Sequence, residues 1–251
     1  MVVKKSMNRV LFLDSGIGGL ALMCRCKQRY KNSEFLYFAD YQNMPYGQKS
    51  INFLRQHLLK TIYNLYQKFH FGIVVLACNT ATSVAIQFLR KNMPYIIFIG
   101  IEPAVKQAYK LGYKKTLVLA TENTILHNKL IKKMSVLPNF ELILAPMHGL
   151  ATKVEKGWQN PGQIVRQLKP VFSKYKGTVD SVVLGCTHYY LIKTELKKYF
   201  CVEVFDGFDG VVDRLGEFIK NTAKKSKIIM LTNDSTKLFR IDTLWQYLAN
   251  N

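Results

Sequence analysis

The stretch VVLACNT occupies residues 74–80, and the similar stretch VVLGCTH occupies residues 182–188. Each contains a run of apolar, partly β-branched residues that ends in a cysteine followed by polar side chains. The two copies lie about one domain apart, whereas short solenoid repeats recur roughly every 20 to 50 residues. The spacing therefore predicts a duplicated unit, with one cysteine at the end of a buried strand in each copy.

Similar apolar runs alternate with longer amphipathic stretches along the whole chain, which is typical of βαβ units and a mostly parallel sheet. The amphipathic segment at residues 51–69 follows Ser50, which is a suitable N-cap for a helix. The predicted strands are residues 9–13, 34–38, 73–77, 96–99, 116–120, 142–144, 181–184 and 228–231.

The fold class expected from this pattern is α/β, with two pseudo-symmetric domains, each a mostly parallel sheet flanked by helices. The first domain is predicted to contain residues 1–97 and a returning C-terminal segment, residues 209–251. The second is predicted to contain residues 98–208. Ligands of open α/β sheets bind outside the carboxyl ends of the strands, so both cysteines are expected where ligands bind. If the two halves face each other, the thiols do too, and the active site is expected in the cleft between the domains.

The 36 Lys and Arg residues outnumber the 16 Asp and Glu residues, giving a formal net charge of +20. This charge favours an anionic partner and leaves a nucleic-acid-binding protein as an alternative of a different class. The basic residues are scattered, for example in the pairs at 114–115, 132–133 and 197–198, and do not form one recognition segment. We therefore interpret the charge mainly as solubility and as attraction of a small acidic substrate, with nucleic-acid contact at most a secondary property.

The five cysteines are odd in number and show no ligand spacing of a zinc site, so we expect no metal. No apolar stretch approaches the roughly 18 residues that a membrane span requires, and no export signal is recognisable. These features predict reduced thiols, a cytoplasmic location and no membrane partner.

The paired cysteines suggest a specific chemistry. A free cysteine at a strand end is often simply a small buried hydrophobic residue. Two opposed thiols, however, can remove a proton from one face of a carbon atom and return one to the other face. A thiol has an ordinary pKa near 8.5, so a neighbouring acid or base must assist it, and His188 is the nearest histidine to Cys186. The other histidines are expected to be structural or exposed.

Two further segments lie at predicted strand ends. Asp14 and Ser15 precede the glycine-rich turn at residues 16–19, whose backbone N–H groups can face an anion. Residues 45–47, Pro-Tyr-Gly, follow the second predicted strand and lie on the expected ligand side.

Together, these motifs resemble the cofactor-independent aspartate/glutamate racemase superfamily and, within it, the glutamate racemases. The resemblance runs nearly end to end, and its motifs are specific in combination. They are DSGIGGL (14–20), YFADYQNMPYG (37–47), VVLACNTAT (74–82), GIEPA (100–104), LATENT (119–124) and VVLGCTHYYL (182–191).

The resemblance implies interconversion of L- and D-glutamate without pyridoxal phosphate or another cofactor, supplying D-glutamate for peptidoglycan. It implies that Cys78 acts on the D-face with help from Asp14, and that Cys186 acts on the L-face with help from His188 and Glu155. The substrate-binding residues that it implies are Asp14, Ser15, Tyr46, Gly47, Asn79, Thr80, Thr121, Thr124, Thr187 and His188.

Two alternatives stay open within this interpretation. A sister enzyme with the same paired thiols could act on a related amino acid such as aspartate. The sequence also leaves open whether the protein is a homodimer.

Overall fold

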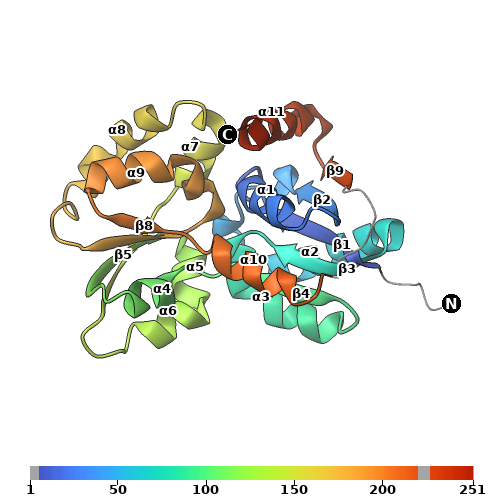
Figure 1. Ribbon diagram of the computed structural model, residues 1–251, viewed down its shortest axis with the longest axis horizontal. Coiled ribbons are helices and arrows are strands. Elements are labelled where there is room, and N and C mark those ends of the chain that lie inside the picture. Colours follow the sequence, from blue (N-terminus) through green and yellow to red (C-terminus); the bar gives the residue numbers. More distant parts are fainter. Residues whose placement is uncertain (1–5, 220–226, 251) are drawn as a thin grey trace. The chain divides into compact units, whose positions relative to one another are not determined.

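A computed structural model describes residues 6–219 and 227–250. The chain forms two compact units (Figure 1). Unit 1 extends to Ile101 and resumes at Phe208, and unit 2 comprises Glu102–Gly207. The limits given above for the two domains stay a prediction.

The sheet of unit 1 has five parallel strands in the order β4-β3-β1-β2-β9. In Figure 1 the red strand β9 lies beside the blue strand β2, so a segment from the far end of the chain completes this sheet. The strands are β1 (Ser6–Asp14), β2 (Glu34–Ala39), β3 (Phe71–Leu76), β4 (Ile97–Gly100) and β9 (Lys227–Thr232).

Helices follow these strands, as the alternating pattern predicts. Ser50 is the N-cap of α2, since its hydroxyl accepts a hydrogen bond from Phe53 N at 3.2 Å, and His70 ends the helix in the left-handed region with φ of 52°. The helices and 3-10 turns of unit 1 are α1 (Leu20–Arg29), η1 (Tyr41–Asn43), η2 (Tyr46–Gln48), α2 (Ile51–Phe69), α3 (Asn79–Asn92), α10 (Phe208–Gly216), η4 (Ser235–Lys237) and α11 (Leu238–Asn250).

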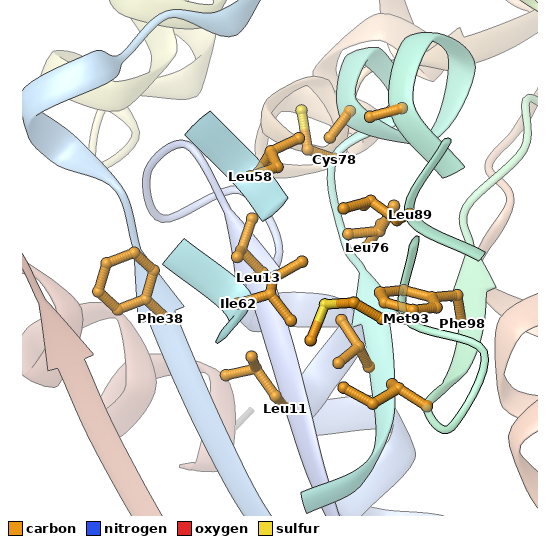
Figure 2. Close-up of a cluster of buried hydrophobic side chains, with 14 of the residues drawn as sticks. Leu11, Leu13, Phe38, Leu58, Ile62, Leu76, Cys78, Leu89, Met93 and Phe98 are labelled. Carbon is orange, nitrogen blue, oxygen red and sulfur yellow. The ribbon is translucent and has the colours of Figure 1, made fainter. Parts of the chain in front are cut away.

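One face of the unit 1 sheet packs against α2 and α3. Alternate strand residues such as Leu11 and Leu13 contact helix residues such as Leu58 and Ile62, and all four are fully buried. Burying each such side chain contributes about 1.5–3 kcal/mol. Figure 2 shows Cys78 at one end of this cluster, where β3 leads into α3. The packed core thus fixes the position of this cysteine.

Unit 2 has a four-stranded parallel sheet in the order β6-β5-β7-β8. Its strands are β5 (Lys115–Ala120), β6 (Glu141–Pro146), β7 (Ser181–Gly185) and β8 (Glu203–Phe205). Its helices and 3-10 turn are α4 (Val105–Lys110), α5 (Glu122–His127), α6 (Lys129–Met134), α7 (Leu150–Gly157), α8 (Pro161–Phe172), η3 (Thr187–Ile192) and α9 (Lys193–Phe200).

Helices cover both faces of this second sheet (Figure 1). On one face, Leu117 and Val182 pack against α7, α8 and α9. On the other face, Val118 and Val183 pack against α4 and α6. Both sheets are therefore parallel and flanked by helices, which confirms the predicted α/β class. Along the described part of the chain, no helix has the length and apolar character needed to cross a membrane.

Candidate active site

In unit 1, the strand order reverses at β1, which has β2 on one side and β3 on the other. Such a switch point opens a crevice at the carboxyl ends of the two central strands, where α/β proteins bind ligands. Asp14 is the last residue of β1, and Cys78 follows β3 by two residues. The register places them at the ends of neighbouring strands, because Leu13 pairs with Leu76.

The turn after β1 is built around Asp14. The carboxylate is fully buried, and its Oδ1 accepts hydrogen bonds from Gly16 N at 3.0 Å and Ser15 Oγ at 3.3 Å. A Cβ atom at Gly19 would lie 2.7 Å from Ala77 Cβ and 3.1 Å from Asp14 Oδ2. Only glycine lets the turn approach so closely, so the turn at residues 16–19 holds Asp14 beside the segment that leads to Cys78.

Cys78 and the residues after it are buried at the start of α3. The cysteine is 7% exposed, and Asn79 and Thr80 are each 2% exposed. Asn79 Nδ2 donates to the carbonyl of Ile101 at 3.4 Å, whereas its Oδ1 accepts no hydrogen bond from the described residues. A buried oxygen in this state favours a ligand that donates a hydrogen bond.

Tyr46 lies in η2, next to Gly47, and its hydroxyl donates to Asp40 Oδ2 at 2.6 Å. Burial, followed by the charges of Asp40, Cys78 and Asp14, raises the pKa of Tyr46 well above its usual value. The phenol is therefore neutral, and its hydroxyl lies within electrostatic reach of the unit 1 cysteine. Asp14, Ser15, Tyr46, Cys78, Asn79 and Thr80 are all buried in the same unit.

Unit 2 repeats this arrangement at β5, which has β6 on one side and β7 on the other. Ala120 pairs with Gly185, so Thr121 and Cys186 leave adjacent strands at the same level. A Cβ atom at Gly185 would lie 2.6 Å from Ala120 Cβ and 3.3 Å from the carbonyl oxygen of Leu119. The glycine before Cys186 is therefore required by the close approach of β5 and β7.

His188 and Glu155 form a buried pair beside Cys186. His188 Nε2 lies 2.8 Å from Glu155 Oε2, and the side chains are 2% and 7% exposed. Burial lowers the pKa of His188, but hydrogen bonds to Cys186 and Glu155, together with their charges, outweigh it and raise the pKa well above its usual value. This shift favours the protonated imidazole, which can stabilise a Cys186 thiolate.

The other predicted residues of unit 2 follow β5 and β7 in the chain. Thr121 is the N-cap of α5, where its hydroxyl accepts from Thr124 N at 3.2 Å and lies 2.9 Å from Thr124 Oγ1. Thr187 is buried between Cys186 and His188. The structure thus brings Thr121, Thr187, His188, Glu155 and Cys186 to the carboxyl end of one sheet.

Sequence reasoning missed Asp40, which is fully buried at the end of β2. A signal was present, because Asp40 ends the apolar run of β2 just as Asp14 ends that of β1. His57, expected to be structural or exposed, contacts the Asp40 carboxylate with its Nε2 at 2.6 Å. Within residues 6–219 and 227–250, no three His, Cys, Asp or Glu side chains gather closely enough to hold a metal ion.

The sequence of this chain matches a known protein family. Residues 30–215 match the Asp/Glu/Hydantoin racemase family. The chain belongs to this racemase family. A relative in it, the glutamate racemase of Clostridium novyi (strain NT), is 38% identical over 216 residues, which cover 84% of this chain and 83% of that protein. The resemblance inferred from the motifs is confirmed.

Solved structures of racemases share the fold. The glutamate racemase of Campylobacter jejuni subsp. jejuni matches with a TM-score of 0.81 at 24% identity, over 96% of this chain and 98% of that one. Escherichia coli glutamate racemase, solved in complex with L-glutamate and the activator UDP-MurNAc-ala, matches with a TM-score of 0.80 at 21% identity, over 96% and 94% of the two chains. The racemase family fold therefore extends over nearly the whole chain.

Proposed function

We propose that this protein interconverts L- and D-glutamate without a cofactor and supplies D-glutamate for peptidoglycan. One observation carries the proposal. Cys78 and Cys186 each follow a strand at the switch point of a parallel sheet, and each has a buried acid or base for a neighbour. Membership of the racemase family and relatives named glutamate racemase support the same conclusion.

The proposed reaction is proton exchange at Cα. A thiolate removes the Cα proton and becomes a thiol, leaving a carbanion stabilised by the α-carboxylate. The thiol of the other cysteine gives its proton to the other face of the carbon and becomes a thiolate. Cys78 acts on the D-face and Cys186 on the L-face, and their roles exchange in the reverse direction. No oxidation or reduction occurs, so one thiolate and one thiol are sufficient for the exchange.

The proposed role of Cys186 is supported by the charge of its neighbours. A protonated His188 next to the sulfur favours the thiolate, because opposite charges a few ångströms apart in a buried site attract strongly. Glu155 keeps the imidazole protonated through the 2.8 Å contact. We propose His188 as the assisting group and Glu155 as the residue that orients and charges it.

The proposed role of Cys78 is supported by the buried groups around the end of β1. Asp14 is proposed to assist Cys78, and Asn79 Oδ1 is suited to accept a hydrogen bond from the α-ammonium group of the substrate. The backbone N–H groups of the turn at residues 16–19 suit a carboxylate. The remaining proposed substrate-binding residues are Ser15, Tyr46, Gly47, Thr80, Thr121, Thr124, Thr187 and His188.

Four finer points belong to this proposal. Preference for glutamate over aspartate is tested by comparing kcat/KM for the two acids. A homodimer is tested by light scattering on the purified protein, and a cytoplasmic location by fractionating cells that produce it. The charge of +20 predicts that any nucleic-acid contact ignores sequence and weakens steeply with salt.

Incubation with L-glutamate in deuterated buffer, without added cofactor, tests the proposal. Optical rotation and Cα deuterium are followed together, the latter by NMR. We expect rotation to fall towards zero while deuterium enters the newly formed D-glutamate. If neither rotation nor deuterium content changes, with glutamate or with aspartate, the proposed function is wrong.

A further inference from the structure

The buried carboxylate of Asp40 accepts four hydrogen bonds, and the donors come from four different segments. Oδ2 lies 2.6 Å from both the Tyr46 hydroxyl and His57 Nε2. Oδ1 lies 2.9 Å from Asn43 Nδ2 and is also bonded by Asn233 Nδ2. These donors belong to η1, η2, α2 and the turn after β9.

Four donors occupy about all the lone-pair positions that a carboxylate offers. A protonated carboxyl would place its own hydrogen against one of them, so this arrangement favours the ionised form. Burial alone would raise the pKa of Asp40, but hydrogen bonds from His57, Asn43 and Tyr46 outweigh it and lower the pKa. Asp40 is therefore a fixed, ionised acceptor beneath the loop that carries the Tyr46–Gly47 segment.

The bond to Asp40 determines how Tyr46 can act on its other neighbours. A phenol has one proton, and here that proton is donated to Asp40 Oδ2. Towards other groups the oxygen can therefore only accept. Tyr46 and Cys78 belong to the same buried hydrophobic cluster, and η2 packs against α3, which begins directly after Cys78. After burial and Asp40, the charges of Cys78 and Asp14 also raise the pKa of Tyr46. Tyr46 thus presents lone pairs, and no proton, to the region of the unit 1 cysteine.

Asn233 connects this arrangement to the returning C-terminal segment. Besides the bond to Asp40, its side-chain oxygen accepts from Gln42 N at 3.2 Å, and its carbonyl accepts from Gln42 Nε2 at 2.6 Å. Asn233 lies outside residues 30–215, the part of the chain that matches the racemase family. The segment after β9 therefore holds the loop between β2 and η2 in place.

We propose that Asp40 and Asn233 are positioning residues for the racemase reaction. Asp40 keeps the Tyr46 hydroxyl an acceptor beside Cys78, and Asn233 holds Asp40 and its loop in the required place. The expected change in racemase activity rests on the proposed function. The expected change in the reactivity of the Cys78 thiol does not.

A double-mutant cycle with Asp40→Asn and Tyr46→Phe tests the activity. We expect Asp40→Asn to lower kcat/KM for glutamate roughly tenfold in the wild-type background and less than about twofold in the Tyr46→Phe background, because residues that act through one another are not additive. Equal losses in both backgrounds would overturn the inference, as would no loss in the wild type. Asp242→Asn, an exposed carboxylate on α11, is the matched control.

The pH dependence of Cys78 alkylation by iodoacetamide, followed by peptide mass spectrometry, tests the same inference without glutamate. In the Asp40→Asn variant, Tyr46 no longer donates its proton to a carboxylate and can donate it to a Cys78 thiolate. We therefore expect the pH at which Cys78 alkylation is half-maximal, the alkylation midpoint, to fall. The shift should be smaller in the Tyr46→Phe background. A midpoint that stays or rises would overturn the role of Asp40. A wild-type protein that shows no racemisation would instead overturn the proposed function.

Asn233→Ala tests the second residue and also serves if Asp40→Asn fails to fold. This variant removes the donor to Asp40 and the acceptor of Gln42 N while leaving the carboxylate in place. We expect a loss of kcat/KM and a downward shift of the Cys78 midpoint, each smaller than for Asp40→Asn. Wild-type values for both quantities would overturn the role of Asn233.

Discussion

His188 Nε2 lies 2.8 Å from Glu155 Oε2, and both side chains are buried. The histidine comes from η3, directly after β7, and the glutamate from α7, which packs against η3. The contact places the imidazole proton of His188 and the negative charge of Glu155 next to Cys186. It gives the unit 2 cysteine a neighbour whose protonated form the charge of Glu155 favours.

The two-thiol mechanism predicts that neither cysteine can be replaced. Cys78→Ser and Cys186→Ser should each lower kcat for racemisation by roughly 10²- to 10⁴-fold, because a hydroxyl is nearly isosteric but much harder to deprotonate. Chiral chromatography of the product measures the rate. Cys201→Ser, at the exposed cysteine, should keep wild-type activity. Near-normal racemisation by either of the first two variants would contradict the mechanism.

Removing the charge of Glu155 should slow proton transfer by Cys186. We expect Glu155→Gln to lower kcat/KM about tenfold, since a general acid or base contributes about 10²- to 10⁴-fold and His188 itself remains. The pKa of His188 should also fall, so activity should decline from a lower pH on the alkaline side. A pH profile of kcat/KM measures both effects. Glu141→Gln, at an exposed carboxylate, is the control, and an unchanged profile for Glu155→Gln would refute the assignment.

The raised pKa of His188 predicts how stability depends on pH. A group whose pKa is higher in the folded state stabilises the fold fully below its unfolded pKa, about 6.5 for histidine, and this contribution is lost as pH rises through the folded pKa. The free energy of unfolding of the wild type, minus that of His188→Asn, should therefore decrease as the pH is raised above neutrality. Urea unfolding across that range measures the difference. A gap that widens with pH would contradict the shift.

Gly185 should tolerate no side chain. Gly185→Ala would place a Cβ atom 2.6 Å from Ala120 Cβ, so β5 and β7 must separate, and we expect a loss of about 1–3 kcal/mol in the free energy of unfolding. Thermal or urea unfolding measures it. Gly210→Ala, in α10 with nothing within 4 Å of the added atom, should be neutral or stabilising. Equal effects of the two substitutions would show that strand spacing is not the cause.

Most of the fold was predictable, because buried parallel strands are short apolar runs and their order follows from simple rules. The capping of α2 by Ser50 was also predictable from the residue type alone. The strand β8 was not predicted, since Glu203–Phe205 contains three residues and shows no alternation or apolar run long enough to stand out. Its place at the edge of the second sheet depends on tertiary contacts.

The site was predictable where residues recur in a motif and not where distant segments meet. Cys78 and Cys186 were found because they end matching strands. The Asp40 arrangement was missed because its donors include His57 and Asn233, which lie 17 and 193 residues away in the chain. Neither stands in a motif, and only the folded backbone brings their side chains to one carboxylate.

The pairing of β2 with β9 has a consequence for how the protein is made. On the ribosome, residues 34–39 emerge long before residues 227–232, and all of unit 2 is synthesised between them. Nascent chains fold as segments become available, and pairings between distant segments form slowly. Unit 2 can therefore acquire its complete sheet while the first sheet still lacks an edge strand, and the Asp40 carboxylate receives the Asn233 donor only after all of unit 2 has been synthesised.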